Sequence, residues 1–365
     1  MTARTILLNP GPVTLTDGVR QAMTRADWCH REPEFAKLTQ SINGRLAGVY
    51  KAAADEFAAV LLSGSGTSAV EAMLTTFAPV DGKTLVAANG VYGERMAAML
   101  RSMGRPMELV AAAWDAPIDL DAVEECLSAQ SGITHLVAVH HETTTGRLNE
   151  VDELGALCIK HDCALLLDAV SSFGAEEIQF REWNLQALAG TANKCLHGVP
   201  GLSFVLARRV MFSGKEAVSD SVYLDLHRYF HTQHDQGYSP FTLSVQVAFA
   251  LDVALDELRE CGGWPKRRQR YRAVANSIRK TLRGVGVKTF IPESDCSSVM
   301  SSYRLPTGVT YAALHDRLKE QGFIIYAGQG HFSGSMFRIA NMGAIMDSDV
   351  ERLNHALTSF LIDAQ

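Results

Sequence analysis

Several features that would assign this chain to a class at once are missing from its sequence. No segment approaches the run of about twenty apolar residues that crosses a membrane, and no charged-then-apolar signal peptide opens the chain. The formal net charge of −6 provides no broad basic surface for nucleic acid. The seven cysteines are an odd number and none lie in Cys-x-x-Cys spacing, which favours reduced thiols over a disulfide framework or a zinc site. We therefore expect a cytoplasmic protein without a metal site, a membrane span or a nucleic-acid partner.

What the sequence does have is the composition of a globular enzyme, with 47% hydrophobic and 20% charged residues. Before residue 244, short apolar runs that suit strands alternate with stretches of helical periodicity. The expected strands are residues 84–88, 107–112 and 135–140, and the expected helices are residues 93–103, 120–130 and 151–161. This βαβ alternation predicts an α/β fold whose mostly parallel sheet is covered by helices on both faces.

The pattern changes after Ser244. A long helix is expected over residues 245–260, and a basic helix follows through Arg283. The rest of the chain mixes expected strands at residues 287–291, 299–305, 323–327 and 336–340 with expected helices at residues 311–321 and from 347 onward. We therefore divide the 365 residues into a large domain at residues 1–250 and a small α+β domain at residues 251–365.

A glycine-rich turn follows the expected strand at residues 58–63. This turn, Gly64-Ser65-Gly66-Thr67, opens a helix at residues 68–77, so its free backbone N–H groups and the helix dipole favour an anion such as a phosphate. Ser65 and Thr67 add hydroxyl donors. The turn lacks the Gly-Lys-Ser/Thr of a nucleotide P-loop and the full fingerprint of a dinucleotide site. On its own, this turn is better explained as the start of an ordinary capped helix.

Asp168 and Lys194 lie where two buried strands are expected to end. The apolar run from residue 163 stops at Asp168, and the run from residue 187 is followed by Asn193 and Lys194. In open α/β sheets, chemistry collects beyond the carboxyl ends of the strands. An acid for the pyridinium nitrogen and an amine for covalent attachment are the two protein groups that pyridoxal phosphate (PLP) requires. Either residue alone is better explained as a surface lysine or a capping aspartate, and it is their pairing that favours PLP.

Arg338 is the strongest candidate for binding a substrate. It lies inside the apolar strand pattern at residues 336–340, where an unpaired charge costs several kcal/mol to bury. Its guanidinium suits a carboxylate or a phosphonate, or alternatively a structural carboxylate of the protein itself. His140 and His141 are rejected as a metal pair, because neighbours on a strand face opposite ways.

Short motifs along most of the chain resemble one family, the class V aminotransferases of fold type I. The motifs are Leu7-Leu-Asn-Pro-Gly-Pro12, Gly64-Ser-Gly-Thr67, Asn89-Gly-Val-Tyr-Gly93, Glu142-Thr-Thr-Thr-Gly146, Asp168-Ala-Val-Ser-Ser-Phe-Gly174, Ala192-Asn-Lys-Cys195 and Phe337-Arg338-Ile339. Within this class, the Glu-Thr-Thr-Thr-Gly and Ala-Asn-Lys-Cys strings are similar to the phosphonate branch.

The resemblance implies PLP as the cofactor, with Lys194 and Asp168 as catalytic residues. It also implies further cofactor contacts from Ser65, Gly66, Thr67, Tyr92, Thr143, Asn193 and Thr242. Tyr92 would stack on the pyridine ring. Thr242 would reach the phosphate in the neighbouring subunit, which makes the enzyme a homodimer. Arg338, Gly11 and Pro12 would contact the substrate, the last two from an N-terminal segment at residues 1–15.

The expected reaction moves the amino group of 2-aminoethylphosphonate to pyruvate. Two stretches, residues 27–35 with His30 and Arg31 and residues 223–238, depart from the pattern, so an alanine or serine:glyoxylate enzyme or a related aminophosphonate donor stays open. A PLP lyase such as a cysteine desulfurase needs a cysteine on a distal loop, and residues 328–332 contain none. A binding protein without catalysis would have no need of the Lys194 amine.

Overall fold

A seven-stranded sheet forms the centre of the larger part of the molecule. The computed structural model describes residues 4–213 and 219–363. The strand order is β2 (Phe57–Gly64), β10 (Gly201–Arg208), β9 (Leu185–Thr191), β8 (Ala164–Asp168), β5 (Ile133–Val139), β3 (Lys83–Ala88) and β4 (Met107–Ala111). β10 runs antiparallel to both of its neighbours and all the other pairs in the sheet are parallel. The predicted α/β fold with a mostly parallel sheet is therefore confirmed.

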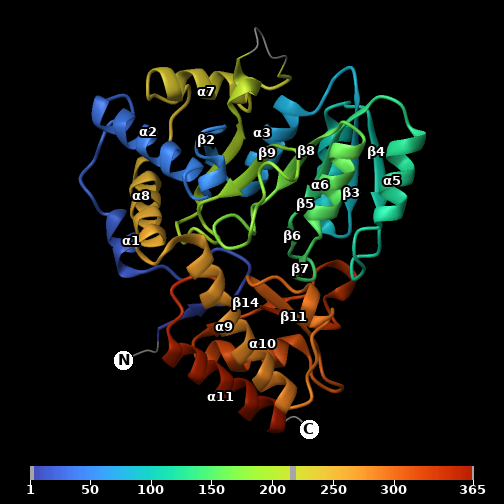
Figure 1. The fold of residues 1–365 in the computed structure, drawn as a ribbon. Coiled ribbons are helices and arrows are strands. Elements are labelled where there is room, and N and C mark those ends of the chain that lie inside the picture. The colour runs from blue at the N-terminus through green and yellow to red at the C-terminus, as the bar shows by residue number, and fades with distance from the viewer. Residues whose placement is uncertain (1–3, 214–218, 364–365) are drawn as a thin grey trace.

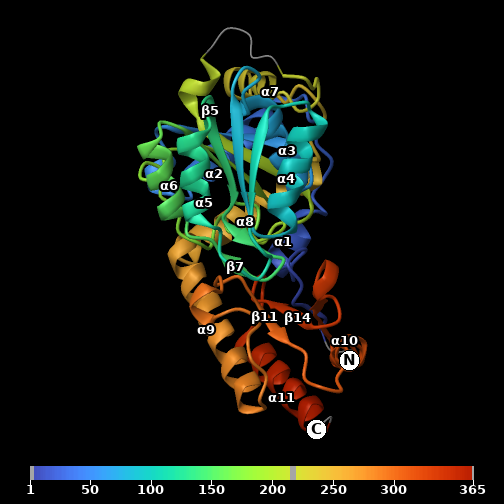
Figure 2. The same ribbon diagram turned by 90° about the vertical axis from the view of Figure 1, so that its right-hand side faces the viewer.

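Both faces of this sheet are buried, which explains why its strands are almost continuously apolar. In β2, Phe57, Ala59 and Leu61 join one core, while Ala58, Val60 and Leu62 join another on the opposite face. The first core is covered by α2 (Pro33–Ala47), α5 (Leu120–Ala129), α6 (Val151–Lys160) and α8 (Val245–Glu260). The second is covered by α3 (Gly66–Phe77), α4 (Val91–Ser102) and α7 (Leu226–Asp235). Figure 2 shows α5 and α6 on one side of the sheet and α3 and α4 on the other.

The smaller part lies below the sheet in Figure 1 and carries both ends of the chain. Its antiparallel sheet has the order β11 (Met300–Arg304), β14 (Met336–Ala340) and β13 (Tyr326–Ala327). A second pair joins β1 (Ile6–Leu7) to β12 (Phe323–Ile324) in parallel. These strands pack with α9 (Gly263–Gly284), α10 (Tyr311–Glu320) and α11 (Asp347–Asp363). The N-terminal strand thus belongs to the core of the C-terminal domain, and the chain passes from there to α1 (Asp17–Ala22), which packs on α8.

Two predicted strands of the small domain are wrong. Residues 287–291 form only an isolated bridge between Thr289 and Tyr303. Residues 323–327 are not one strand, because Phe323–Ile324 pair with β1 whereas Tyr326–Ala327 pair with β14 in another sheet. An apolar run predicts burial but does not specify the partner strand, and here its two halves have different partners.

The domain boundary at residue 250 stays a prediction. It falls inside α8, and Phe249 and Leu255, on either side of it, both pack in the core of the large sheet. We therefore propose a boundary where α8 ends and α9 begins, at residues 261–262.

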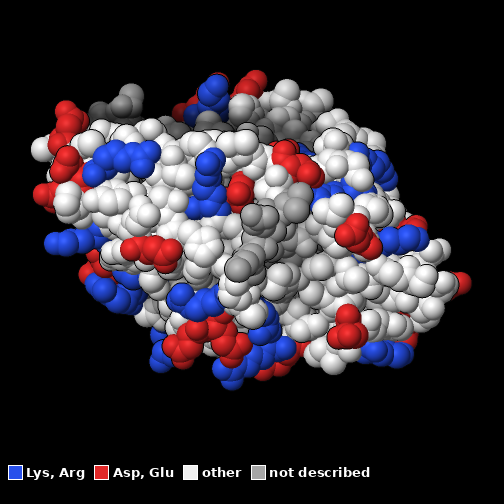
Figure 3. Space-filling view, turned by 90° about the horizontal axis from the view of Figure 1, so that it is seen from above, with Lys and Arg blue, Asp and Glu red and all other residues white. Residues whose placement is uncertain are grey.

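The surface and the helices add two observations. On the face seen in Figure 3, basic and acidic side chains of the described residues lie mixed among uncharged ones. Within residues 4–213 and 219–363, every helix is too short or too polar to cross a membrane.

Candidate active site

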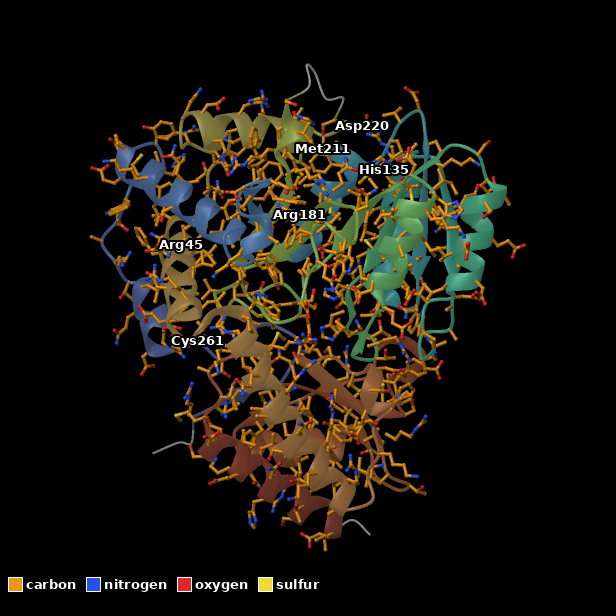
Figure 4. The ribbon with its side chains drawn as sticks, in the orientation of Figure 1. Arg45, His135, Arg181, Met211, Asp220 and Cys261 are labelled. Carbon is orange, nitrogen blue, oxygen red and sulfur yellow. The ribbon has the colours of Figure 1, made fainter. Side chains whose placement is uncertain are left out.

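Three of the predicted segments meet at the carboxyl edge of the sheet. Since β2, β8 and β9 run in the same direction, the turn after Gly64, the side chain of Asp168 and the turn that contains Lys194 lie at one edge. This edge faces the small domain. Figure 4 labels His135 and Met211 at the opposite edge, far from the small domain.

Lys194 lies in the turn that follows β9, and its amine points to the loop that follows β8. Its Nζ donates a hydrogen bond of 2.7 Å to Ser171 Oγ and lies 5.9 Å from the centre of the Tyr92 ring. The N-terminal segment packs along the lysine stem, because a Cβ on Gly11 would lie 3.1 Å from Lys194 Cγ. Gly11 also has a φ of +106°, which a side chain would strain. Asn193 accepts a hydrogen bond of 2.7 Å from Thr191 Oγ1.

Asp168 is a buried carboxylate that takes part in no ion pair within the described ranges. Its Oδ1 accepts a hydrogen bond of 2.9 Å from the Val170 amide. Burial raises the pKa of Asp168, while the Val170 amide and the charges of Lys194 and Arg95 lower it. A buried carboxylate of this kind is suited to a cation that is brought in from outside, such as a protonated pyridine nitrogen.

One small cavity is shared by the glycine turn, Tyr92, Asp168 and Val170. Ser65 is the N-cap of α3, and Gly66 and Thr67 are its first residues, so their amides face away from the helix body. Gly66 needs to be glycine, because a Cβ would lie 2.6 Å from Val170 Cγ1. The aromatic ring of Tyr92 and the isopropyl group of Val170 thus border the same space as the predicted phosphate turn.

Arg338 enters the site from β14 of the small domain. It is 3% exposed, and its partners are neutral: Nη1 donates to the Thr143 carbonyl at 2.7 Å and to Gln329 Oε1 at 3.1 Å, and Nε donates to the Ala327 carbonyl at 2.8 Å. No carboxylate of the described residues forms an ion pair with it. The alternative of a structural ion pair is therefore not found there. Its charge is available for an anion that arrives in the site.

Thr143 contributes two features to the same place. Its carbonyl binds Arg338, and its hydroxyl Oγ1 is buried without a hydrogen-bond partner among the residues that the structure describes. An unpartnered buried hydroxyl is unusual, since most buried polar atoms find a partner. It fits the predicted contact of Thr143 with the cofactor.

Sequence reasoning missed Ser171, Glu142 and Arg95. Glu142 Oε2 accepts from the amides of Tyr92 at 3.3 Å and Gly93 at 3.4 Å, so this buried carboxylate fixes the start of α4 and with it the Tyr92 ring. The Arg95 guanidinium lies 4.8 Å from the Tyr92 ring centre and donates to Thr67 Oγ1 at 3.4 Å. The sequence contained one indication of the Glu142 contact, Gly90 in the motif at residues 89–93. A Cβ at Gly90 would clash with the Glu142 side chain, so only glycine fits there.

The first divergent stretch, residues 27–35, contacts residues that follow the second stretch, near the end of β2. Arg31 donates to the carbonyls of Ser239 at 3.0 Å and Pro240 at 3.3 Å, and His30 Nε2 lies 3.4 Å from the exposed Thr242 Oγ1. Ser63 Oγ donates to the Thr242 carbonyl at 3.1 Å. Thr242 therefore lies beside the strand that leads into the glycine turn of its own subunit. Its predicted contact with a neighbouring subunit stays a prediction.

The chain belongs to the class V aminotransferase family. The profile of that family, "Aminotransferase class-V", matches residues 22–348. In fold, the chain is similar to an alanine–glyoxylate aminotransferase from Nostoc sp., with a TM-score of 0.90 and 24% identity over 99% of this chain and 96% of that one. The predicted family and its PLP-dependent transaminase class are confirmed.

Among curated relatives, the chain is similar to the 2-aminoethylphosphonate–pyruvate transaminase of Pseudomonas putida (strain GB-1). The identity is 34% over 358 residues, which cover 98% of this chain and 96% of that protein. It is also 34% identical to a bifunctional phosphonoacetaldehyde hydrolase/aminoethylphosphonate transaminase of Clostridioides difficile (strain 630), of which it spans 56% of the length.

Family membership implies PLP as the cofactor, and the residues present fit it. Within the described residues, the buried Asp168 carboxylate has no ion-pair partner and the buried Thr143 hydroxyl has no hydrogen-bond partner. The turn at Gly66 has no room for a side chain. PLP carries a ring nitrogen, a ring hydroxyl and a phosphate that suit these three positions.

Proposed function

We propose that the chain transfers the amino group of 2-aminoethylphosphonate to pyruvate, giving phosphonoacetaldehyde and L-alanine. The observation that carries the proposal is Arg338, a buried guanidinium whose partners are all neutral and which is anchored to Thr143 beside the Lys194 site. Both the donor and the acceptor carry an acid group for it to bind. The names of the relatives, at 34–35% identity over nearly the whole chain, support the same substrates.

In this proposal the cofactor is held by Lys194 at one end and by the amides and hydroxyls of Ser65, Gly66 and Thr67 at the phosphate. Tyr92 and Val170, which line the small cavity, would border its ring, and Thr143 and Asn193 would add polar contacts. When bound, PLP withdraws electrons from the carbon that carries the donor amine.

Three side chains, those of Asp168, Lys194 and Arg338, then carry out the reaction. The Asp168 carboxylate holds a proton on the pyridine nitrogen, because it is buried and has no ion-pair partner among the described residues. The Lys194 amine, once released by the donor, takes the proton from the donor carbon as a general base and delivers it to the cofactor carbon C4′ as a general acid. Arg338 orients the acid group of the donor, and of the keto acid that follows it, while Gly11 packs along the lysine stem and Pro12, the next residue, is proposed to contact the substrate.

Specificity is tested by the ratio of kcat/KM values. We expect 2-aminoethylphosphonate with pyruvate to exceed alanine or serine with glyoxylate by at least about tenfold, the discrimination that roughly 1.4 kcal/mol supplies. If alanine or serine with glyoxylate gives the higher value, the phosphonate assignment is wrong and the glyoxylate alternative holds.

The anion site is tested by Arg338→Lys. A phosphonate carries more negative charge than a carboxylate near neutral pH, and lysine cannot form the bidentate fork, so kcat/KM should fall further with the aminophosphonate donor than with alanine. Arg304→Lys, on the neighbouring strand β11 and outside the site, is the matched control and should change neither value. Equal losses with both donors would argue against a phosphonate pocket.

We also propose a homodimer with shared sites, since the exposed Thr242 side chain borders the glycine turn at the surface. Sedimentation at assay concentration should give twice the 39.7 kDa chain mass. A fully active monomer would contradict it. The seven unpaired cysteines support a cytoplasmic location.

A further inference from the structure

We propose that Ser171 positions the reactive amine of Lys194, and that the small domain holds Ser171 in place through the ring of His141. The inference deepens the proposed function and rests on Lys194 being the residue that bonds to the cofactor. The sequence alone did not indicate that Ser171, His141 or Ser297 takes part in positioning this amine.

The first contact joins Lys194 to Ser171. The 2.7 Å hydrogen bond from Nζ to Ser171 Oγ is the one that this amine makes within the described residues. Ser171 is 6% exposed, so water has little access to take over the role of the hydroxyl. A flexible four-carbon stem loses several rotamers when its end is held, and a hydrogen bond of this length selects among them. The hydroxyl therefore decides where the amine points when it is not bonded to the cofactor.

The second contact holds the main chain of Ser171. Its carbonyl oxygen lies 3.0 Å from His141 Nδ1 and accepts a weaker hydrogen bond from Cys195 Sγ at 3.5 Å. Cys195 directly follows Lys194 in the chain. The turn that carries the Ser171 hydroxyl is thus tied both to the lysine turn and to the segment that contains Glu142 and Thr143.

The third contact reaches the small domain. A carbonyl oxygen only accepts, so the His141 hydrogen lies on Nδ1, and burial lowers the pKa of His141 to about 4, which keeps the ring neutral. Nε2 is therefore an acceptor, and it receives the Ser297 hydroxyl at 2.8 Å. The Ser297 oxygen in turn accepts from the amides of Val299 and Met300, each at 3.2 Å.

The serine, the imidazole and the second serine form one chain of hydrogen bonds from β11 to the lysine. Both ring nitrogens of His141 and the hydroxyl of Ser297 have partners, and such a buried network holds its groups in a single arrangement. The backbone amide of Ser297 also donates to the Gly146 carbonyl at 2.9 Å. The small domain thus contributes Arg338 to the substrate site. Through Ser297, His141 and Ser171, it also fixes the position of the Lys194 amine.

The test uses the capture of PLP by the apoprotein, which requires no amino donor. In this step Nζ forms a bond to the aldehyde carbon of PLP, and the aldehyde oxygen leaves as water with the two protons of the neutral amine. Ser171→Ala should slow the appearance of the visible absorption band by about tenfold, because the amine is no longer oriented. Turnover should show the same loss in kcat, with KM for each substrate within about threefold of the unmodified enzyme.

Ser172→Ala is the matched control. Ser172 is the next residue in the same turn, is fully buried and donates at 3.4 Å to the Ala169 carbonyl instead of touching Lys194. It should leave capture, kcat and the melting temperature unchanged. Ser171→Ala with capture and kcat within twofold of the unmodified protein would overturn the proposal, and so would an equal loss in Ser172→Ala.

A double-mutant cycle tests the link to the small domain. His141→Gln alone should slow capture, but added to Ser171→Ala it should have little further effect, since it acts through that serine. Independent, multiplicative losses would overturn the link. Because capture involves no substrate, a wrong assignment of the amino donor would leave these results intact, and the kcat/KM ratios would fail instead.

Discussion

Lys194→Ala should abolish both the capture of PLP and turnover. The amine is the nucleophile that attaches the cofactor and the base that moves the proton, and general acid–base catalysis alone contributes about 10²–10⁴-fold. We expect kcat to fall by at least about a thousandfold, with no reducible visible band after PLP is added to the apoprotein. Absorbance spectra and steady-state rates measure both effects on one preparation.

The control for this variant is Lys160→Ala, an exposed lysine near the end of α6 that pairs with Glu124. It should retain the band and the rate. A Lys194→Ala protein with full activity would remove the basis for the whole proposed mechanism.

Asp168→Asn should lower the activity of the enzyme without lowering the stability of the apoprotein. The amide cannot hold a proton on the pyridine nitrogen, so kcat should fall by at least about a hundredfold, the usual effect of losing one preorganised electrostatic partner. The apoprotein should be at least as stable as the unmodified one. The buried carboxylate has no ion-pair partner among the described side chains, and an amide avoids the desolvation of a charge.

The direction of the pH dependence follows from the raised pKa of Asp168. A carboxyl whose folded-state pKa lies above its ordinary value of 3.8 binds its proton more tightly in the folded state, so its contribution to stability is lost as the pH rises through that pKa. The stability advantage of Asp168→Asn should therefore grow as the pH rises from about 4 and then level off. Thermal melts of the apoproteins measure it, and an Asp168→Asn apoprotein that is much less stable at pH 7 would contradict the reasoning.

The sequence by itself determined the class of the sheet and the position of its reactive edge. Strands that are buried on both faces must be apolar throughout, so β2, β5 and β8 are visible as runs, and the residue that ends each run is placed at the edge of the sheet. This is why Asp168, Lys194 and the glycine turn were predicted together. The motif strings added the family, which the comparisons confirm.

Only the tertiary structure decided which distant side chains share the site. Arg338 meets Thr143 across 195 positions of sequence, Gly11 packs against Lys194, and Ser297 fixes His141 across the domain interface. Periodicity reports how each segment is buried and where it turns, but it carries no information on which buried surfaces face one another. For the same reason, the sequence did not show that residues 323–327 divide between two sheets. Their pairing depends on β1 and β14, which the local pattern does not contain.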